Sequence, residues 1–565
     1  MSDPVELVEL RVLDGPNLYF PRPAIKVTIA VPGWMRAGEP AVRRAGRSLG
    51  IRSPAGRAGS DRRLRYVARV AAGVVRRLAA ATEVPRLGVR ARPGPEPEQI
   101  VVAFPWRRRT AAVALAKATA RALELSLRRS PGPVIAELAR ALGDVEPGPE
   151  PTVADPGVPV IQVTGTNGKT TTVRLLAHLV EASGSTVAYS STDGVYRGSV
   201  RVRKGDYSGF GGAATALAQW PDVAVLETAR GGILQRGIGV LHNDVAVVTN
   251  VSADHLGLHG IRTVDQLAEV KATIVRITRQ EGWDVLNADD PRVLAMRRQA
   301  TGRPWVVSLD PHHPAIREAL ADGGRATTVL DGRIAWLEPG RIHTLVPLLD
   351  VPITLAGVSS IYTANALAAA TAALGVGIAP AAVTKGLRSF VLDPERNPGR
   401  ANLFGLDGRV IVVDYAHNEA GMRGLVEIVR GLRRPGAATW LAICTAGDRT
   451  PEILHGFAFQ AAVGVDHLAI ADLRHYTRGR TAAQIYEALA AAAAEAGVTD
   501  PPRYRGELHA LRSMLERSAR HDVLAVTALG MRGPIFRWLS DHGARRLTPT
   551  DVRRLARAAR RPSTA

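Results

Sequence analysis

A glycine-rich turn between an apolar run and a helical segment constrains this sequence more than any other feature. Residues 160–163 form a short, mostly apolar run interrupted by Gln162, and apolar side chains recur at helical spacing from residue 170 to residue 181. Gly165 and Gly168, which lie between them, permit a tight turn. The segment therefore predicts a strand, a phosphate-binding loop and a helix.

The chemistry of this loop predicts a bound nucleotide. Successive backbone N–H groups and the helix N-terminus attract phosphate oxygens. Lys169 adds a mobile positive charge, and the Thr170 hydroxyl can ligate the Mg²⁺ that a nucleotide carries. We expect ATP or a close relative to bind to the residues Gly165, Thr166, Asn167, Gly168, Lys169, Thr170 and Thr171.

The length of the chain exceeds what one hydrophobic core supports. Its 565 residues predict about three or four domains. The sequence contains no run of eighteen apolar residues and starts with neither a basic segment nor an apolar core, so we expect a soluble, cytoplasmic protein without a membrane partner. The one cysteine, Cys444, adjoins an apolar run, which excludes disulfides and a cysteine metal site and predicts a buried thiol.

The formal net charge of +21 raises the question of nucleic-acid binding. Most of this charge is Arg scattered among Ala and Gly, without interleaved aromatic residues or a nucleic-acid motif, so we expect no nucleic-acid partner. Two interpretations stay open: a solvated Arg-biased surface, and an acidic polymer or peptide as substrate. Because the chain uses Arg almost throughout, Lys169 and Lys271 stand out as lysines retained for amine chemistry or shape.

Residues 1–145 are expected to form a separate α+β domain. Strand-like and helical patterns alternate in it, at residues 7–13, 25–31, 64–81, 100–104 and 111–127. We find no catalytic constellation there, so this part is predicted to be a scaffold or a docking module. Its arginine runs suit either a solvated face or an anionic chain. The Pro-rich stretch 146–157 predicts a stiff linker to the next domain.

Residues 158–392 alternate between strands and helices, which predicts a parallel sheet covered on both faces. Glu227 follows one strand, and Asn250, Asp254 and His255 follow the next. Such residues are often helix caps or loop residues, but in an open α/β sheet the carboxyl ends of the strands surround the ligand. We therefore expect Glu227 and His255 to lie near Thr170 and to hold Mg²⁺.

Two further positions follow in this domain. Lys271 lies in a helix that comes after the His255 loop. Asn287 ends another strand and precedes Asp289, Asp290 and Pro291. Two interpretations of Asn287 stay open, a contact with a nucleoside and an Asx turn before a proline-started helix.

A break at residues 393–400 separates a second, smaller parallel-sheet domain of Rossmann-like α/β type, residues 393–565. Asp414 follows its strand at 409–413. An acidic residue in this place suits a ribose hydroxyl, so Asp414 is a candidate for that contact.

Taken in chain order, these motifs resemble the Mur ligase superfamily, which uses the short loop form Gly-Thr-Asn-Gly-Lys-Thr found at 165–170. Within it the likeness is strongest to the Mur-like part and the N-terminal domain of the cyanophycin synthetases. The stretches that carry this likeness are residues 11–17, 227–234, 250–258, 397–404 and 478–480. Cyanophycin synthetases also carry an ATP-grasp domain, and the linker at 146–157 stands in its place here, so we expect a relative with one reaction.

The resemblance implies an ADP-forming amide ligase. ATP phosphorylates a carboxylate, and an amine attacks the resulting acyl phosphate. In this family pattern the catalytic residues are Lys169, Glu227, His255 and Lys271. Thr170 and Glu227 would hold one magnesium ion, and His255 and a carbamylated Lys271 would serve a second. Asn287 would contact adenine, Asp414 the ribose and Arg400 the phosphates.

The substrates are the least defined part of the prediction. The resemblance implies a peptide-like or acidic-polymer carboxylate as acceptor and an amino acid as the amine. Three alternatives stay open: a ligase with Mur-like or folylpolyglutamate-like substrates, a nucleotide-binding scaffold without catalysis, and a basic nucleic-acid binder that uses ATP as a switch. The oligomeric state also stays open, a homo-oligomer included.

Overall fold

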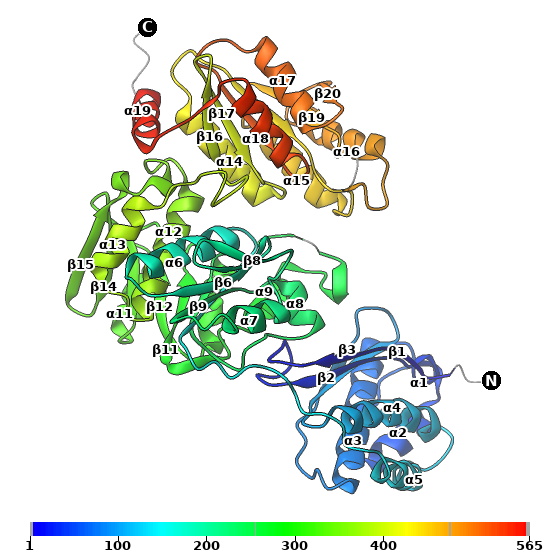
Figure 1. Ribbon diagram of the computed structural model, residues 1–565. Coiled ribbons are helices and arrows are strands. Elements are labelled where there is room, and N and C mark those ends of the chain that lie inside the picture. Colours follow the sequence, from blue (N-terminus) through cyan, green and yellow to red (C-terminus); the bar gives the residue numbers. More distant parts are fainter. Residues whose placement is uncertain (1–3, 255, 474–475, 561–565) are drawn as a thin grey trace.

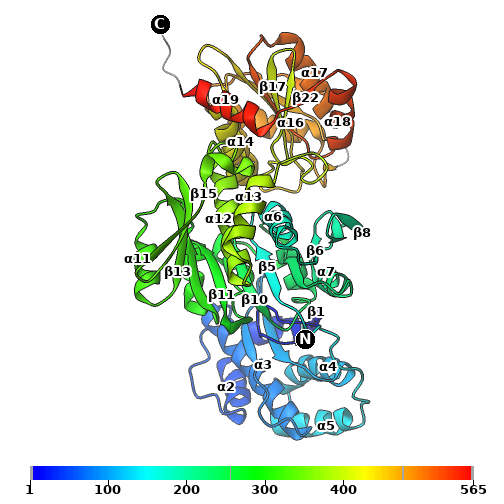
Figure 2. The same ribbon diagram turned by 60° about the vertical axis from the view of Figure 1, so that its left-hand side comes forward.

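The computed structural model describes residues 4–254, 256–473 and 476–560, and it contains three β-sheets in succession along the chain. Figures 1 and 2 show the N-terminal and C-terminal parts at opposite ends of the central part. The expected α/β class is confirmed, with parallel sheets in the central and C-terminal parts and an antiparallel sheet at the N-terminus.

The N-terminal domain is a four-stranded antiparallel sheet covered by helices. Its strands are β1 (Glu6–Leu13), β2 (Ala24–Ala30), β3 (Arg90–Pro93) and β4 (Gln99–Pro105), in the order β1-β2-β4-β3. Its helices are α1 (Pro32–Arg36), α2 (Glu39–Ser48), α3 (Asp61–Ala81), α4 (Arg109–Ser126) and α5 (Pro131–Gly143). Arg63 of α3 is buried, and its guanidinium donates to the carbonyl oxygens of Trp34, Ala37, Ala55 and Gly56, which fixes the loops around α1 and α2.

The Pro-rich stretch 146–157 is attached at both ends. The backbone N–H of Arg109 donates to the oxygen of Pro149 at 2.9 Å, which ties the stretch to the start of α4. Further along, Ala154 forms a β-bridge with Val240 of the central domain, and the N–H of Leu241 donates to its oxygen at 2.9 Å. This stretch is therefore a bonded strap between the two domains.

The central domain is built on a sheet of eleven strands, ordered β15-β14-β13-β12-β11-β10-β5-β9-β6-β7-β8. The strands from β13 to β6 in this order are parallel, and antiparallel hairpins extend both edges. The strands are β5 (Val160–Thr164), β6 (Val187–Ser191), β7 (Gly194–Arg197), β8 (Val200–Lys204), β9 (Val223–Glu227), β10 (Asn243–Val248), β11 (Thr278–Asn287), β12 (Arg303–Val307), β13 (Arg325–Leu330), β14 (Arg333–Glu338) and β15 (Arg341–Pro347).

Helices cover both faces of this sheet, which buries it in two apolar clusters. One face packs against α6 (Lys169–Ala182), α12 (Ser360–Gly375) and α13 (Pro380–Ser389). The other packs against α7 (Phe210–Leu217), α8 (Arg230–Gln235) and α9 (Val264–Lys271). The remaining elements are α10 (Pro291–Ala295), α11 (Pro314–Ala321) and the short turns η1 (Leu258–Gly260), η2 (Met296–Gln299), η3 (Leu348–Asp350) and η4 (Pro352–Thr354).

The C-terminal domain has a seven-stranded sheet in the order β20-β19-β18-β21-β17-β16-β22, parallel from β20 to β17. The strands are β16 (Asn402–Leu406), β17 (Arg409–Asp414), β18 (Thr439–Ile443), β19 (His467–Ala471), β20 (Arg503–Tyr504), β21 (Val523–Thr527) and β22 (Arg545–Arg546). The helices are α14 (Glu419–Leu432), α15 (Pro451–Ala462), α16 (Ala482–Glu495), α17 (Glu507–Arg517), α18 (Arg532–Asp541) and α19 (Pro549–Ala559). Cys444 is buried, as predicted.

Among the described residues, no helix is both long and apolar enough to cross a membrane.

Candidate active site

The glycine-rich loop joins β5 to α6 in a conformation that its two glycines permit. Gly168 is the N-cap of α6 and has φ = +87°, in the left-handed region that favours glycine. A Cβ on Gly165 would overlap the Thr249 hydroxyl, and one on Gly168 would overlap the Asn365 amide. Both positions therefore require glycine for space as well as for backbone geometry.

The loop is held by residues that follow β10. Asn250 accepts from the N–H of Asn167 at 2.9 Å through its side chain, and its backbone oxygen accepts from the N–H of Thr166 at 2.8 Å. The Thr249 hydroxyl donates to the oxygen of Asn167 at 2.7 Å. These bonds fix the loop without a ligand, so the site is preorganised for phosphate binding.

Glu227 lies beside the loop, as the order of the strands predicts. It is 2% exposed and accepts from the Thr170 hydroxyl at 2.9 Å. The Thr192 hydroxyl, at the end of β6, lies 3.0 Å from that of Thr170 and donates to Glu227 at 3.3 Å. Burial raises the pKa of Glu227, although the Lys169 ammonium and the Thr170 hydroxyl oppose this shift.

This group of oxygens fits a nucleotide-bound Mg²⁺. One carboxylate and two hydroxyls converge, and these are the hard ligands that Mg²⁺ prefers. Within the described ranges, no group of three or more His, Cys, Asp or Glu side chains is placed to hold a metal. An ion at Glu227 and Thr170 would therefore depend on phosphate oxygens for part of its coordination. His255 lies outside the described residues.

Two lysines line the same cavity. Lys169 donates to the oxygen of Thr166 at 2.9 Å, and burial lowers its pKa against the attraction of Glu227 and Asp254. Lys271 is 3% exposed and donates to the oxygen of Gly165 at 2.5 Å. Burial lowers the pKa of Lys271 well below its ordinary value, and the nearby Lys169 ammonium lowers it further.

The C-terminal domain closes this cavity from the other side. The Asn167 and Asn418 amides donate to each other, at 3.1 and 3.0 Å. Asp254 of the central domain lies 3.2 Å from Arg449 and 3.6 Å from His417. The structure therefore brings the phosphate loop within hydrogen-bond distance of the C-terminal domain.

Arg400 and Asp414 lie at this domain junction. The Arg400 guanidinium stacks on the Tyr415 ring at 4.7 Å and lines the cavity that contains Lys169. The Asp414 carboxylate accepts from the N–H of Ala401 at 2.7 Å and from the Tyr362 hydroxyl at 3.3 Å. Burial raises the pKa of Asp414, which Arg400 opposes. Asp414 faces a small cavity next to Gly168 rather than the larger one that Asn287 lines.

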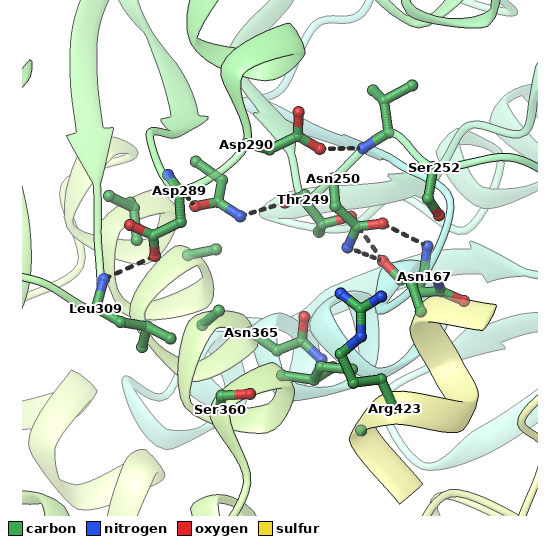
Figure 3. Close-up of a pocket in the computed structure, with 18 of the residues that line it drawn as sticks. Asn167, Thr249, Asn250, Ser252, Asp289, Asp290, Leu309, Ser360, Asn365 and Arg423 are labelled. Carbon is green, nitrogen blue, oxygen red and sulfur yellow. Dashed lines mark hydrogen bonds between the residues drawn. The ribbon is translucent and has the colours of Figure 1, made fainter. Parts of the chain in front are cut away.

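Asn167 lines two cavities, which we call the reaction cavity and the nucleoside cavity after the roles proposed for them below. The reaction cavity, of about 410 Å³, contains the glycine-rich loop, Glu227, Asp254, Lys271 and Arg400. The nucleoside cavity, of about 620 Å³, lies between the end of β11, α12 and α14 and is shown in Figure 3. Asn287 lines it and donates to the oxygen of Thr249 at 2.8 Å.

The sequence analysis missed two residues of these cavities. Thr192 follows β6, so the argument from strand ends that selects Glu227 applies to it as well. The sequence analysis predicts no strand at 187–191 and therefore does not select Thr192. Asn365 is buried in α12, and its amide nitrogen has no hydrogen-bond partner among the described residues while the residue lines the nucleoside cavity. A single Asn within an Ala-rich helix was the available signal.

Family models match the two domains that form this site. The model of the Mur ligase middle domain matches residues 163–373, and that of the Mur ligase glutamate ligase domain matches residues 399–530.

Curated relatives include cyanophycin synthetases and a 2,6-diaminopimelate ligase. The cyanophycin synthetase of Synechocystis is 43% identical over 48% of this chain and 31% of its own length. The UDP-N-acetylmuramoyl-L-alanyl-D-glutamate–2,6-diaminopimelate ligase of Chlorobaculum tepidum is 28% identical over 51% of this chain and 56% of its own. This chain thus spans about a third of the length of the cyanophycin synthetases it matches.

Solved structures share the fold. Escherichia coli FolC, in complex with DHPP and ADP, matches with a TM-score of 0.52 at 21% identity, over 68% of this chain and 90% of its own. A bifunctional folylpolyglutamate synthase/dihydrofolate synthase with Mn, AMPPNP and L-glutamate bound matches with a TM-score of 0.51 at 18% identity, over 68% of this chain and 90% of its own.

Proposed function

Because the chain contains a Mur ligase middle domain followed by a Mur ligase glutamate ligase domain, we propose that it is an ATP-dependent, ADP-forming amide ligase. The observation that carries this proposal is the reaction cavity. It places Lys169, Glu227 and Lys271 of the central domain opposite Arg400 and Arg449 of the C-terminal domain. A carboxylate and the end of a triphosphate can meet there while the nucleoside occupies the adjoining cavity.

The proposed reaction has two steps, formation of an acyl phosphate and attack by the amine. A substrate carboxylate oxygen attacks the γ-phosphorus of ATP, which releases ADP and leaves an acyl phosphate. The neutral amine then attacks the acyl carbon, phosphate leaves, and the ammonium proton passes to solvent, so that an amide remains. Phosphoryl transfer depends mainly on positioning and charge neutralisation, which buried cations supply efficiently.

The residues of the chain have separate parts in this scheme. The loop N–H groups and Lys169 bind the phosphates, and Arg400 approaches them from the C-terminal domain. Thr170 and Glu227 would hold the divalent ion, which lowers the negative charge on the phosphates when bound. We assign Asn287 to the adenine side and Asp414 to the ribose side, since the small cavity that Asp414 lines shares Asn167 and Asn365 with the nucleoside cavity. We assign His255 and Lys271 to a second ion. The amide pair Asn167–Asn418 joins the C-terminal domain to the central domain beside the phosphate loop.

The substrates follow from the chemistry and from the relatives. We propose that the acceptor, whose carboxylate is activated, is an acidic peptide or polymer and that the amine is an amino acid. The similarity to cyanophycin synthetases and the net charge of +21 support this choice. We place the domain boundaries at residues 145, 158 and 393.

Phosphate release by the purified protein tests the proposal. The assay contains magnesium ATP, an aspartate-rich peptide and single amino acids in turn, and mass spectrometry follows the peptide. Release that needs both substrates, with a mass gain of one residue minus water, supports the ligase and identifies the amine. ATP binding without release for any pair, including peptides from a metabolite extract, contradicts it and favours a nucleotide-binding scaffold.

A further inference from the structure

The N-terminal domain contacts the central domain close to the reaction cavity. Its partners lie on three segments: residues 234–238 around the end of α8, residues 259–262 around η1, and residues 269–276 at the end of α9 and beyond. Three residues that line the cavity lie on or near these segments in the chain: Arg230 starts α8, Asp254 precedes His259 by five positions, and Lys271 ends α9. Figure 1 shows the β1–β2 end of the domain directed toward this region.

The strongest of these contacts joins Asp14 to Arg236. Asp14 is 4% exposed, and its carboxylate accepts from Arg236 Nε at 2.8 Å, with a second guanidinium nitrogen also at 2.8 Å. The oxygen of Arg236 accepts from the N–H groups of Asp14 at 2.8 Å and Gly15 at 3.2 Å. The Asp14 carboxylate is buried, whereas the Arg236 side chain is half exposed, and both guanidinium nitrogens contact the same oxygen, Oδ2. The backbone bonds at the same two residues add to this charged contact, so several bonds together fix the geometry of the interface.

Arg236 connects the N-terminal domain to a segment that lines the reaction cavity. Its guanidinium stacks on the Phe210 ring at 4.2 Å, and Phe210 is the first residue of α7. Ser208, two residues earlier, lines the cavity and accepts from the N–H of Ala229 at 2.8 Å. The Cα atoms of Gly209 and Gly232 pack so closely that a side chain on Gly232 would not fit.

Arg11 makes a second connection. Its guanidinium donates to the oxygen of Leu234 at 3.2 Å and lies 3.4 Å from the His259 ring. Arg230, which lines the cavity, donates to the oxygen of Leu258 at 3.4 Å, so α8 and η1 are also tied to each other. The N-terminal domain thus holds both segments in a fixed relation.

We infer that the N-terminal domain positions the end of the reaction cavity that Ser208, Ala229 and Arg230 line, which we assign to the substrate carboxylate, with Asp14 and Arg236 as the main positioning residues. The part of its test that measures the KM for the peptide substrate rests on the proposed function. The domain acts through Ser208, Ala229 and Arg230, which face the cavity, and it touches no reacting atom. The nucleoside cavity lies on the opposite side of the glycine-rich loop and is independent of this contact.

The test compares Asp14→Asn and Arg236→Lys with Arg129→Ala, whose exposed ion pair with Glu137 lies within the N-terminal domain and away from the interface. The first readout is amide hydrogen exchange in the full-length free protein. We expect about tenfold faster exchange at residues 229–238 in both interface variants, with α6 unchanged, because local opening follows the loss of local contacts. The control should behave as the wild type.

The second readout separates positioning from a merely structural role. We expect the KM for an aspartate-rich peptide to rise about tenfold in both interface variants, while the KM for ATP stays within twofold. Unchanged exchange at 229–238, faster exchange throughout the chain, or an equal rise of both KM values would overturn the inference. If the wild type shows no turnover with any pair of substrates, the proposed function fails, and the exchange comparison alone still decides the inference.

Discussion

The Asn167 and Asn418 side chains exchange a pair of hydrogen bonds between the phosphate loop and the C-terminal domain. Both residues are amides, so each is donor and acceptor at once, and the pair closes without any net charge beside the phosphate site. Asn418 also caps α14 by accepting from the N–H of Gly421 at 2.9 Å. One side chain therefore both starts a helix and joins two domains.

We predict that Asn418→Ser separates these two roles. Ser preserves helix capping but is too short to reach Asn167. The melting temperature should fall by less than about 3 °C. We expect AMPPNP to compact the wild type in small-angle X-ray scattering, and this compaction should weaken in the variant. Asn418→Ala, which loses the cap as well, is the comparison. Unaltered compaction in the Ser variant would contradict a role of this pair in domain closure.

We predict that Lys169→Ala abolishes ATP-dependent phosphate release. The loss of a positioned cation from phosphoryl transfer costs about 100-fold or more in rate. The measurement is coupled phosphate release, with Lys117→Ala as a control lysine of the N-terminal domain. Full activity of the Lys169 variant would remove this loop from the proposed reaction.

We predict that Lys271→Ala is inactive and that short carboxylates partly restore it. We propose that Lys271 is carbamylated and anionic in the active protein, as the resemblance to Mur ligases implies, and acetate or formate can supply that charge in the space the variant opens. The measurement is phosphate release against carboxylate concentration, with sodium chloride as the ionic-strength control. An Ala variant that is active without rescue would exclude Lys271 from the site.

We predict that Asn365→Ala weakens ADP binding without destabilising the fold. The amide nitrogen of Asn365 has no partner among the described residues, so its removal costs the free protein no hydrogen bond at that atom, whereas a nucleotide loses a donor. Calorimetry should show about tenfold weaker binding. Asn402→Ala is the matched control, because the Asn402 amide is fully engaged with Gly399, Leu392 and Asn397.

For the control we expect the reverse, a lower melting temperature with little change in ADP affinity. Equal effects of Asn365→Ala and Asn402→Ala on stability would argue against a free amide at Asn365.

We predict a pH-dependent stability from Asp284. This residue of β11 is fully buried, and burial raises its pKa to about 7, against bonds from the Thr278 hydroxyl at 2.6 Å and the N–H of Gly302 at 2.9 Å. The folded state therefore binds more protons than the unfolded state between about pH 4 and pH 7, so this residue destabilises the fold progressively as the pH rises through that window.

Asp284→Asn should remove this dependence. Urea unfolding at pH 5 and pH 8 should show the wild type losing on the order of 2 kcal/mol more than the variant on the change to the higher pH. The Asn amide can donate to Thr278 and accept from Gly302, so the packing is preserved. Parallel pH profiles of the two proteins would show that Asp284 does not titrate in this range.

Much of the fold could be predicted because its signals are local. Continuous apolar runs mark β9 and β10, a mostly apolar run marks β5, and the helical pattern after Gly168 marks α6. The position of Glu227 beside Thr170 followed from the rule that the carboxyl ends of parallel strands meet at one edge. Local patterns and sheet geometry together were sufficient for this part of the site.

The other residues of the site are brought together by contacts between segments that lie far apart in the sequence. Asn365 reaches the glycine-rich loop from α12, about 200 residues further along the chain, and nothing in its neighbouring sequence indicates that contact. The pairing of Asn167 with Asn418 depends on the orientation of two domains, which hydrophobic periodicity does not encode. The antiparallel strand β14 carries the apolar run 334–337, which the sequence analysis does not use, and β15 at the edge of the sheet mixes polar and apolar residues.

The strap at residues 146–157 determines how the molecule can move. Because it is bonded to α4 at one end and to Val240 and Leu241 at the other, and because Asp14 and Arg236 join the same two domains, relative rotation of these domains would break bonds at several points. The central and C-terminal domains are joined by the chain between α13 and β16 and by side-chain contacts such as Asn167–Asn418 and Asp254–Arg449. We therefore expect the N-terminal and central domains to move as one body, so that any opening during turnover would separate the C-terminal domain from them across these contacts.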